Sequence, residues 1–241
     1  TLMRSSAASD VYKRQDIAQI LEEYFAAKEP EQEVPVVSEV IDINHTKEYE
    51  DLTIHKVNEH TRAYIKIQDG CNQFCSYCII PYTRGRIRSK NPEEVIEEVK
   101  NLAAQGYKEI VLTGIHLSSY GKDLGTVTLL DVIKRIQQIE DVERIRLGSL
   151  EPRIITEEFV KELVKCDKVC PHFHLSLQSG CDETLKRMNR KYDTARYMES
   201  CDLLRQYFDD PAITTDLITG FPEETEEEFA ESLEFLKTCG L

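Results

Sequence analysis

The sequence predicts an α/β domain built on a parallel sheet, for three reasons. From about residue 62 onward, short apolar segments alternate with segments of helical periodicity. Helix-start signals stand between the two kinds of segment. Gly, Cys and polar residues gather after each apolar segment. Strands and helices in alternation favour right-handed crossovers, in a sheet that is either doubly wound or curled into a barrel. In both forms ligands bind where the strands end.

Each element has its own signal. Asn91 is a helix N-cap followed by Pro92 and two acids, Gly106 ends that helix, and Thr225 with Glu228 forms a capping box. The predicted strands are 63–67, 109–113, 144–148, 172–177 and 212–218. The predicted helices are 91–105, 129–139, a helix after the Thr156 cap, helical segments within 182–207, and a last helix after Thr225.

The chain before this domain divides into two parts. Residues 1–15 are rich in Ser, Ala and Arg and do not begin with Met, which fits either a transit peptide or a non-native, adapter-derived segment. We favour the second interpretation and exclude this part from the fold. Residues 16–60 contain an amphipathic helix at 17–25 and an acidic connector with one short strand around "VPVV" (34–37). Residues 61–241 form the predicted core domain.

Composition sets limits on the class of protein. The 241 residues suffice for one large or two small domains, and 41% of them are hydrophobic. No apolar run approaches the roughly 18 residues of a membrane span, and no signal peptide is visible, so we expect a cytoplasmic protein without membrane contact. In that reducing compartment the eight cysteines are expected to be thiols or metal ligands. The net charge of −14 argues against a general nucleic-acid coat protein.

Three cysteines follow the first predicted strand. Cys71, Cys75 and Cys78 have the spacing C-x3-C-x2-C, which differs from zinc knuckles and from four-cysteine ferredoxin runs. Three thiolates leave one coordination position open, which suits a 4Fe-4S cluster with one iron free for a small ligand. The alternative is a zinc site completed by a His or Cys from elsewhere. The other cysteines have no such arrangement and are expected to be buried thiols.

Basic residues gather in two stretches that follow predicted strands. They are either solvated surface or the positive mouth of an otherwise acidic protein, and we expect the second, with RNA contact through the first stretch. The first stretch contains Arg84, Arg86, Arg88 and Lys90; the second contains Lys186, Arg187, Arg190 and Lys191.

Several longer motifs carry a family resemblance. They are "KIQDGCNQFCSYCIIPYTRGRIRS", "LTGIHLSSYG", "IRLGSLEP", "HFHLSLQSGCDETLKRMNRKY" and "TTDLITGFPEETEEEF". Together they resemble the radical-SAM methylthiotransferases, which insert a methylthio group into tRNA or a ribosomal protein. The resemblance implies an incomplete radical-SAM (β/α)6 partial barrel with five βα units, truncated before its last strand, and a remnant of an N-terminal α/β domain.

The resemblance also implies cofactors and site residues. The three cysteines would hold a 4Fe-4S cluster whose free iron binds S-adenosylmethionine (SAM), while a second cluster is expected in the full-length protein. The radical derived from SAM would abstract hydrogen from C2 of an adenine ring. Residues implied to contact SAM are Thr113 and Gly114 near the methionine part, and Gln178 and Arg190 near ribose or carboxylate; those expected to contact RNA are Arg84, Arg86 and Arg88.

The substrate implied is a tRNA base. "HFHLSLQSG" and "TLKRMNR" are most similar to the branch that acts on N6-threonylcarbamoyladenosine beside the anticodon, so the expected partners are a tRNA anticodon stem-loop and an electron donor. The alternatives are isopentenyladenosine in tRNA, ribosomal protein S12, a radical-SAM enzyme of another substrate class, and a zinc-stabilised binding module.

Three departures from the family pattern matter. The family holds its second cluster with three N-terminal cysteines, whereas no cysteine precedes Cys71 here. The family adds a sixth strand and a basic RNA-binding barrel after the five units found here, so we expect a fragment that is inactive alone. Glu223 stands where many members have Gly, which we interpret as tolerated variation.

Overall fold

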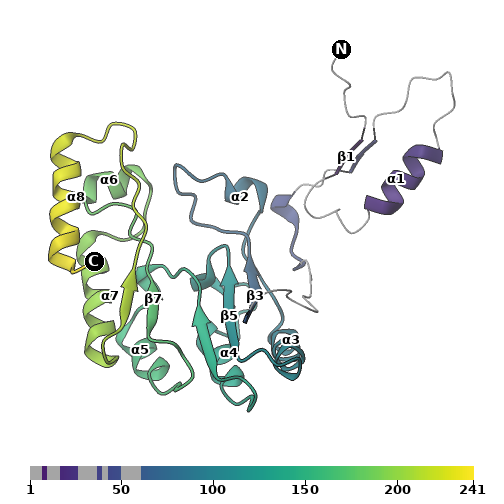
Figure 1. The fold of residues 1–241 in the computed structure, drawn as a ribbon. Coiled ribbons are helices and arrows are strands. Elements are labelled where there is room, and N and C mark those ends of the chain that lie inside the picture. Colours follow the sequence, from purple (N-terminus) through teal and green to yellow (C-terminus); the bar gives the residue numbers. More distant parts are fainter. Residues whose placement is uncertain (1–6, 10–16, 27–36, 40–42, 50–60) are drawn as a thin grey trace. The chain divides into compact units, whose positions relative to one another are not determined.

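A computed structural model describes residues 7–9, 17–26, 37–39, 43–49 and 61–241. The chain separates into two compact units, Thr1–Thr46 and Lys47–Leu241. Each unit is described by itself below (Figure 1).

Among its described residues, the first unit contains a short parallel strand pair, an α-helix and a 3-10 helix. Its elements are β1 (Ala7–Ser9), α1 (Ile17–Ala26), β2 (Val37–Glu39) and the 3-10 helix η2 (Ile43–His45). The helix confirms the amphipathic segment, with Ile20 buried. β1 pairs with β2 although it lies in the segment that we excluded from the fold; the foreign origin of that segment stays a prediction. Of "VPVV", only Val37 is among the described residues.

The second unit is built on a four-stranded sheet in the order β4-β3-β5-β6. Its strands are β3 (Arg62–Asp69), β4 (Arg88–Ser89), β5 (Glu109–Gly114) and β6 (Arg144–Leu147). β3, β5 and β6 run parallel, as predicted. β4 was not predicted, and it pairs antiparallel with the end of β3 over only two residue pairs. A strand this short leaves no periodicity in the sequence.

The remaining two predicted strands form a separate parallel pair, β7 (His172–His174) and β8 (Ala212–Thr214). Isolated parallel bridges, Ile145 to Val169 and Leu150 to Leu175, continue the sheet from β6 toward this pair. Both strands are shorter than predicted because side chains enter the hydrogen bonding beyond them: the Thr215 hydroxyl accepts from the Leu177 N–H. The result is an open α/β half-barrel, which confirms the predicted fold class.

The longer helices lie where they were predicted, with the N-caps Asn91, Thr156 and Thr225 confirmed, whereas the short helix α2 and the Thr128 cap were not predicted. Asn91, Thr128, Thr156 and Thr225 each accept a backbone N–H of the first turn. The predicted segment 182–207 divides into two helices. The bounds are α2 (Ile80–Thr83), α3 (Pro92–Ala104), η3 (Leu117–Ser119), α4 (Leu129–Ile136), η4 (Pro152–Ile154), α5 (Glu157–Leu163), α6 (Asp182–Arg187), α7 (Thr194–Tyr207) and α8 (Glu226–Cys239).

The core lies between the sheet and its helices. Ile65, Leu112, Ile133 and Phe173 are completely buried in one continuous apolar cluster. Figure 1 shows the strands following one another from β3 to β8, with α2 above the end of β3 and α6 at the same edge. The loops after the parallel strands therefore meet at one edge of the sheet. Among the described residues, no helix is long and apolar enough to cross a membrane.

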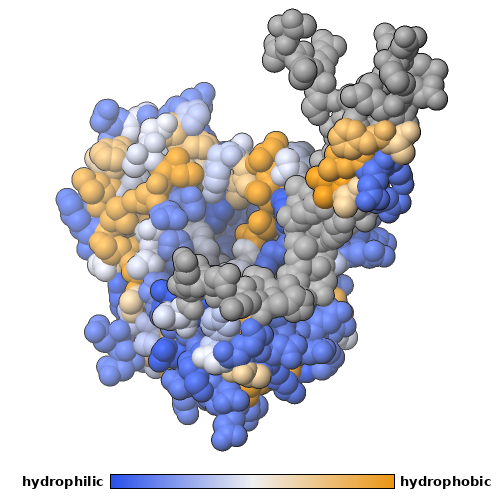
Figure 2. Space-filling model, turned by 45° about the vertical axis from the view of Figure 1, so that its right-hand side comes forward, coloured by the Kyte–Doolittle hydropathy of each residue, from blue (hydrophilic) through white to orange (hydrophobic). Residues whose placement is uncertain are grey.

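The surface of the second unit is uneven in polarity. In the space-filling view its lower part is hydrophilic, and exposed apolar residues gather in the upper part, where the loops after the strands lie (Figure 2). Apolar surface near the ends of parallel strands is typical of a place where ligands or partners bind.

Candidate metal centre

The three cysteines lie on the loop that leaves β3. Cys71 and Cys75 are buried, and Cys78 is half-buried. The loop is tightly turned around them: the Cys78 N–H donates to the Cys75 carbonyl at 3.0 Å, and the Gln73 N–H to the Cys71 sulfur at 3.4 Å. Within the described part of the chain, no three Cys, His, Asp or Glu side chains are already gathered as a metal-binding set.

Gly70 lets this loop return on itself. Its φ is +67°, and a Cβ at this position would lie 1.8 Å from the Arg86 carbonyl oxygen. Only glycine fits such a close approach in a left-handed conformation. The Cys71 N–H then donates to the Gly85 carbonyl at 3.0 Å, which closes the loop at its base.

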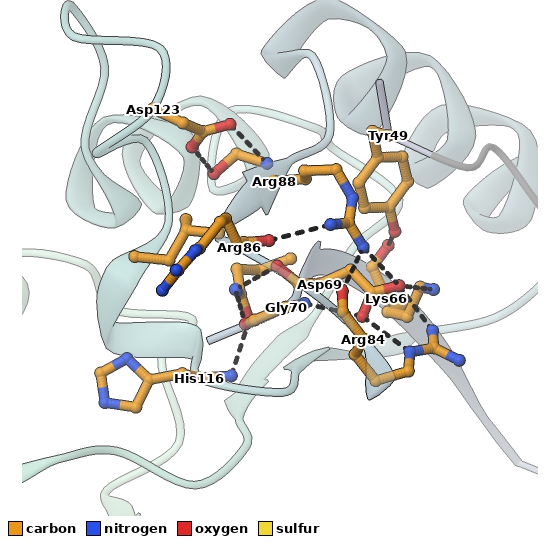
Figure 3. A network of polar contacts seen from close by, with 12 residues as sticks. Tyr49, Lys66, Asp69, Gly70, Arg84, Arg86, Arg88, His116 and Asp123 are labelled. Carbon is orange, nitrogen blue, oxygen red and sulfur yellow. Dashed lines mark hydrogen bonds and ion pairs between the residues drawn. The ribbon is translucent and has the colours of Figure 1, made fainter. Parts of the chain in front are cut away.

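A buried carboxylate holds the two ends of the loop together (Figure 3). Asp69 accepts from Gly70 N–H at 2.7 Å and receives two bonds from Arg84, at 3.2 and 2.5 Å. Arg88 lies 3.8 Å from the same carboxylate and donates to the carbonyls of Arg84 and Arg86. Burial by itself raises the pKa of Asp69, but the bonds from Arg84 and Lys66 outweigh it and hold that pKa below its usual value.

The first basic stretch is therefore largely internal, which corrects part of the sequence-based expectation. Arg88 is 1% exposed and Lys90 2%, and Lys90 pairs with the buried Glu98 at 2.8 Å. Arg84 is half-buried on Asp69. These side chains stabilise the loop, and their contact with RNA stays a prediction. Arg86 is the exposed arginine of the stretch, and its guanidinium lies over the ring of Phe74 at 4.7 Å.

The second basic stretch contacts the cysteine loop directly. The Ser76 N–H and hydroxyl donate to the carbonyls of Met188 and Arg187, at 3.1 and 2.8 Å. The Asn189 amide donates to the Phe74 carbonyl at 2.7 Å. Arg190 places its guanidinium 3.2 Å from the Cys75 sulfur. This segment, which follows β7 in the chain, therefore fixes the position of the loop that follows β3.

The surroundings of Cys71 favour its thiol form until a cation binds. Burial raises the pKa of Cys71, and the nearby Cys75 and Cys78 raise it further, while Arg190 opposes the shift. A bound metal would remove the barrier to deprotonation, because coordinated thiols ionise.

Thr113 and Gly114, expected near the methionine part of SAM, end β5 beside the cysteine loop. The Thr113 hydroxyl donates to the Ile65 carbonyl at 3.1 Å. A Cβ on Gly114 would lie 2.9 Å from the side chain of Gln68. Both residues thus have packing roles within the sheet, and their contact with SAM stays a prediction.

Sequence reasoning missed Gln68, which connects the two loops. It is fully buried, its amide donates to the Asp69 and Gly70 carbonyls at 2.6 and 2.7 Å, and its carbonyl accepts the His116 N–H at 2.6 Å. A polar residue at the end of the apolar strand "YIKIQ" was the available signal.

Sequence reasoning also missed Glu151, which follows β6. This buried carboxylate receives two bonds from Arg153, at 2.7 and 3.1 Å, and lies 3.7 Å from Nε2 of His116. Arg153 donates onward to the Gln73 side chain at 3.1 Å. Burial lowers the pKa of His116 to about 4 against the opposing effect of Glu151, so this imidazole is neutral at pH 7. "SLEP" was noted in the sequence only by position.

Gln178 and an aromatic cleft complete the edge. Gln178 has φ +73°, and its side-chain amide makes no hydrogen bond with the described residues, which leaves it available to a ligand. Tyr77 of the cysteine loop meets Phe221 edge to face at 6.3 Å. Ser76, Tyr77, Arg187, Ile218 and Phe221 line a cleft here, which can accept a flat ring.

The donor set fits an open-site iron–sulfur cluster. It offers three thiols on one buried loop, a guanidinium against one of them, and an adjoining cleft with aromatic walls. A cluster held by three thiolates keeps one iron free for a ligand with amino and carboxylate groups. The chain belongs to the radical SAM superfamily, whose family model matches residues 65–236.

Within that superfamily the relatives found are tRNA methylthiotransferases. The tRNA-2-methylthio-N(6)-dimethylallyladenosine synthase of Thermoanaerobacter sp. (strain X514) is 47% identical over 183 residues, 76% of this chain and 39% of the relative. The threonylcarbamoyladenosine tRNA methylthiotransferase MtaB of Bacillus subtilis (strain 168) is 43% identical over 202 residues, 83% of this chain and 45% of the relative. The predicted resemblance is confirmed, and the chain spans less than half the length of these relatives.

Solved structures agree on the fold. The radical SAM methyltransferase TsrM from Kitasatospora setae aligns over 74% of this chain and 35% of its own, with TM-score 0.62 and 19% identity. The cobalamin-dependent radical enzyme OxsB aligns over 93% of this chain and 34% of its own, with TM-score 0.66 and 13% identity. At these identities the likeness concerns the fold alone. Superfamily membership implies a 4Fe-4S cluster and SAM as cofactors.

Proposed function

We propose that this chain is the catalytic core of a radical-SAM tRNA methylthiotransferase. The observation that carries the proposal is the loop of Cys71, Cys75 and Cys78 at the end of β3, with two of its three cysteines buried. Residues 187–190 brace this loop, and it lies inside the region that matches the superfamily. The relatives' names supply the reaction class. Because the chain covers less than half of each relative, methylthio transfer belongs to the complete protein and the chain alone is expected to be inactive in it.

The proposed site residues divide the work of holding the cofactors. Cys71, Cys75 and Cys78 would hold the cluster, which when bound supplies the electron that cleaves SAM to a 5'-deoxyadenosyl radical. The cleft beside Tyr77 and Phe221 suits the adenine ring of SAM, since both aromatic residues line it. Residues proposed to contact the rest of SAM are Thr113, Gly114, Gln178 and Arg190.

The proposed substrate is N6-threonylcarbamoyladenosine in a tRNA anticodon stem-loop, modified at C2 in the cytoplasm with electrons from a separate donor. This choice rests on "HFHLSLQSG" and "TLKRMNR". Isopentenyladenosine is the competing substrate, since relatives named for each adenosine have similar identity, 47% and 43%. Ribosomal protein S12 is the third. A second cluster is expected in the complete protein.

A chimera tests the function and separates these substrates. Residues 61–241 would replace the corresponding region of the Bacillus subtilis relative in a strain that lacks that relative, and tRNA nucleosides would be measured by mass spectrometry. We expect 2-methylthio-N6-threonylcarbamoyladenosine to reappear, and to disappear again with Cys75→Ala in the chimera. A stable chimera that binds iron and SAM but leaves every tRNA adenosine unmodified would contradict the proposal. Methylthiolated isopentenyladenosine alone would change the substrate.

A further inference from the structure

The cysteine loop has an exposed side on which aromatic and cationic groups are stacked. The Arg86 guanidinium lies 4.7 Å from the centre of the Phe74 ring, and Phe74 meets Tyr82 edge to face at 5.5 Å. Tyr82 is 61% exposed, and Ile79, at the start of the same short helix, is 65% exposed. We call Phe74, Ile79, Tyr82 and Arg86 the stacking surface. Large apolar groups this exposed commonly mark an interaction site.

Arg86 differs from the other arginines of its stretch. Arg84 and Arg88 both pair with the carboxylate of Asp69, and Arg88 is buried. Arg86 has no carboxylate within ion-pairing distance among the residues that the structure describes, and its carbonyl, not its guanidinium, is tied into the loop (Figure 3). Its charge is therefore available to a ligand, and its planar group already lies on an aromatic face.

The backbone holds the central ring of this surface in a costly conformation. Phe74 has φ +54°, in the left-handed region that a bulky residue rarely adopts. The bond from the Asn189 amide to the Phe74 carbonyl, 2.7 Å long, secures it. Strain of this kind persists where the surroundings enforce it, and it often accompanies function. Here it fixes a half-buried ring between Arg86 and Tyr82 where a relaxed loop would let the ring turn.

We propose that the stacking surface binds unpaired nucleobases of single-stranded RNA beside the reaction site. This inference rests on the proposed function and adds to it the residues that hold the bases next to the modified one. Aromatic and guanidinium faces accept any base by stacking, which is how proteins hold unpaired RNA. Phe74 lies between Cys71 and Cys75 in the sequence, so a base stacked here would be a near neighbour of a base at the cluster.

The positive charge of Arg86 favours nucleic acid over a protein partner for this surface. The chain carries a net charge of −14, and most of it repels phosphate. The stacking surface combines a free cation with two aromatic rings, which is a poor match for a purely apolar protein face and a good match for a base with its phosphate. The alternative is that this surface binds a second copy of the chain or another protein, and the test must be able to detect this.

The test measures RNA affinity of single variants by fluorescence anisotropy. The probe is a labelled RNA hairpin with an adenine-containing single-stranded loop, and a fully paired duplex of the same length is its control. The protein is the whole chain, reconstituted with iron and sulfide under anaerobic conditions. The variants are Tyr82→Leu, Tyr82→Phe and Arg86→Ala, and the matched control is Lys100→Ala, which removes an exposed cation of α3.

The expected result is specific to the aromatic ring. Tyr82→Leu should weaken hairpin binding on the order of tenfold, because one stacked base is lost, while Tyr82→Phe should bind as the parent does. Arg86→Ala should weaken it severalfold and reduce the salt dependence, and Lys100→Ala should change neither. Far-UV circular dichroism and iron content should be the same in all four, since the Tyr82 and Arg86 side chains are exposed.

The opposing outcomes are separable from failure of the proposed function. Hairpin binding that is unchanged in Tyr82→Leu and Arg86→Ala would overturn this inference while leaving the proposed function intact. A hairpin and a duplex bound equally well would overturn it too, because stacking requires unpaired bases. Self-association that is lost in Tyr82→Leu with RNA binding intact would assign the surface to a protein partner. A cluster-loaded parent chain that binds no RNA hairpin would overturn this inference, whereas the proposed function is tested separately by the chimera.

Discussion

The two basic stretches of this chain, residues 84–90 and 186–191, have similar charge and different roles. In the first, Arg84, Arg88 and Lys90 are drawn inward by the buried carboxylates of Asp69 and Glu98. In the second, the backbone and Arg190 reach across to the cysteine loop. The comparison teaches that charge in a sequence says little about exposure when an acidic partner lies elsewhere in the chain.

The largest expected effect is on folding, through the first stretch. Asp69→Asn removes the buried carboxylate charge that pairs with Arg84 and Arg88, and removing one partner of a buried ion pair costs about 3–5 kcal/mol. We expect the free energy of unfolding in urea to fall by that amount. The matched control is Glu93→Gln, which breaks the exposed pair with Arg135 and should change the free energy of unfolding little, because solvent screens an exposed pair. Equal losses in the two variants would show that the Asp69 network is not buried.

The next effect is the pH dependence of folding stability through His116, whose pKa is influenced by Arg190 of the second stretch. Burial, with help from Lys122, Arg190 and Arg153, lowers the pKa of His116 to about 4, whereas an unfolded His titrates near 6.5. The unfolded chain therefore binds a proton first as pH falls, so this contribution is fully present above pH 6.5 and is lost between about 6.5 and 4. The loss is up to about 3 kcal/mol.

Urea unfolding at several pH values checks this assignment. His116→Asn should have a flatter stability profile between pH 6.5 and 4 than the parent chain. Arg190→Met should lower the parent's pH dependence slightly, because one of the cations that oppose protonation is gone. A parent and a His116→Asn variant with identical profiles would contradict the assignment.

A smaller effect on folding and a selective effect on metal are expected for Arg190→Met. The guanidinium bonds to the Tyr192 hydroxyl at 3.0 Å and to the Cys75 sulfur at 3.2 Å, so its loss should cost about 1–2 kcal/mol. Iron loss to a chelator should become severalfold faster, since a positive charge beside a ligating sulfur is removed. Unchanged iron loss in Arg190→Met would contradict the role assigned to the second stretch.

The smallest effect is a gain in stability next to the second stretch. Glu223 has φ +67° and borders the cleft that Arg187 lines. Glu223→Gly should stabilise the chain by about 0.5–1 kcal/mol, because glycine adopts this conformation without strain. Glu223→Ala should give no gain, since it keeps the Cβ. Thermal unfolding midpoints of the two variants and the parent chain check this prediction. Equal midpoints for Glu223→Gly and the parent chain would contradict it. This conformation explains why glycine suits the position, which the sequence alone suggested was mere variation.

The predictable part of the fold came from local signals. Strand periodicity, helix caps and the cysteine spacing each occupy a short segment, and the structure contains a strand at each of the five predicted positions. What escaped prediction depends on pairs far apart in the chain. The Asn189 amide and the Phe74 carbonyl are 115 residues apart, and the burial of Arg88 depends on Asp69 across a strand pair of two residues. Neither segment contains a local sequence pattern that predicts a partner so far away in the chain.

The central claim is that Cys71, Cys75 and Cys78 hold an open-site cluster. Iron and sulfide content after anaerobic reconstitution, with electron paramagnetic resonance of the reduced chain before and after SAM is added, tests it most directly. We predict about four irons per chain and a signal that SAM alters, both lost in Cys75→Ala. A folded chain that takes up zinc in place of iron, or whose signal ignores SAM, would contradict the account.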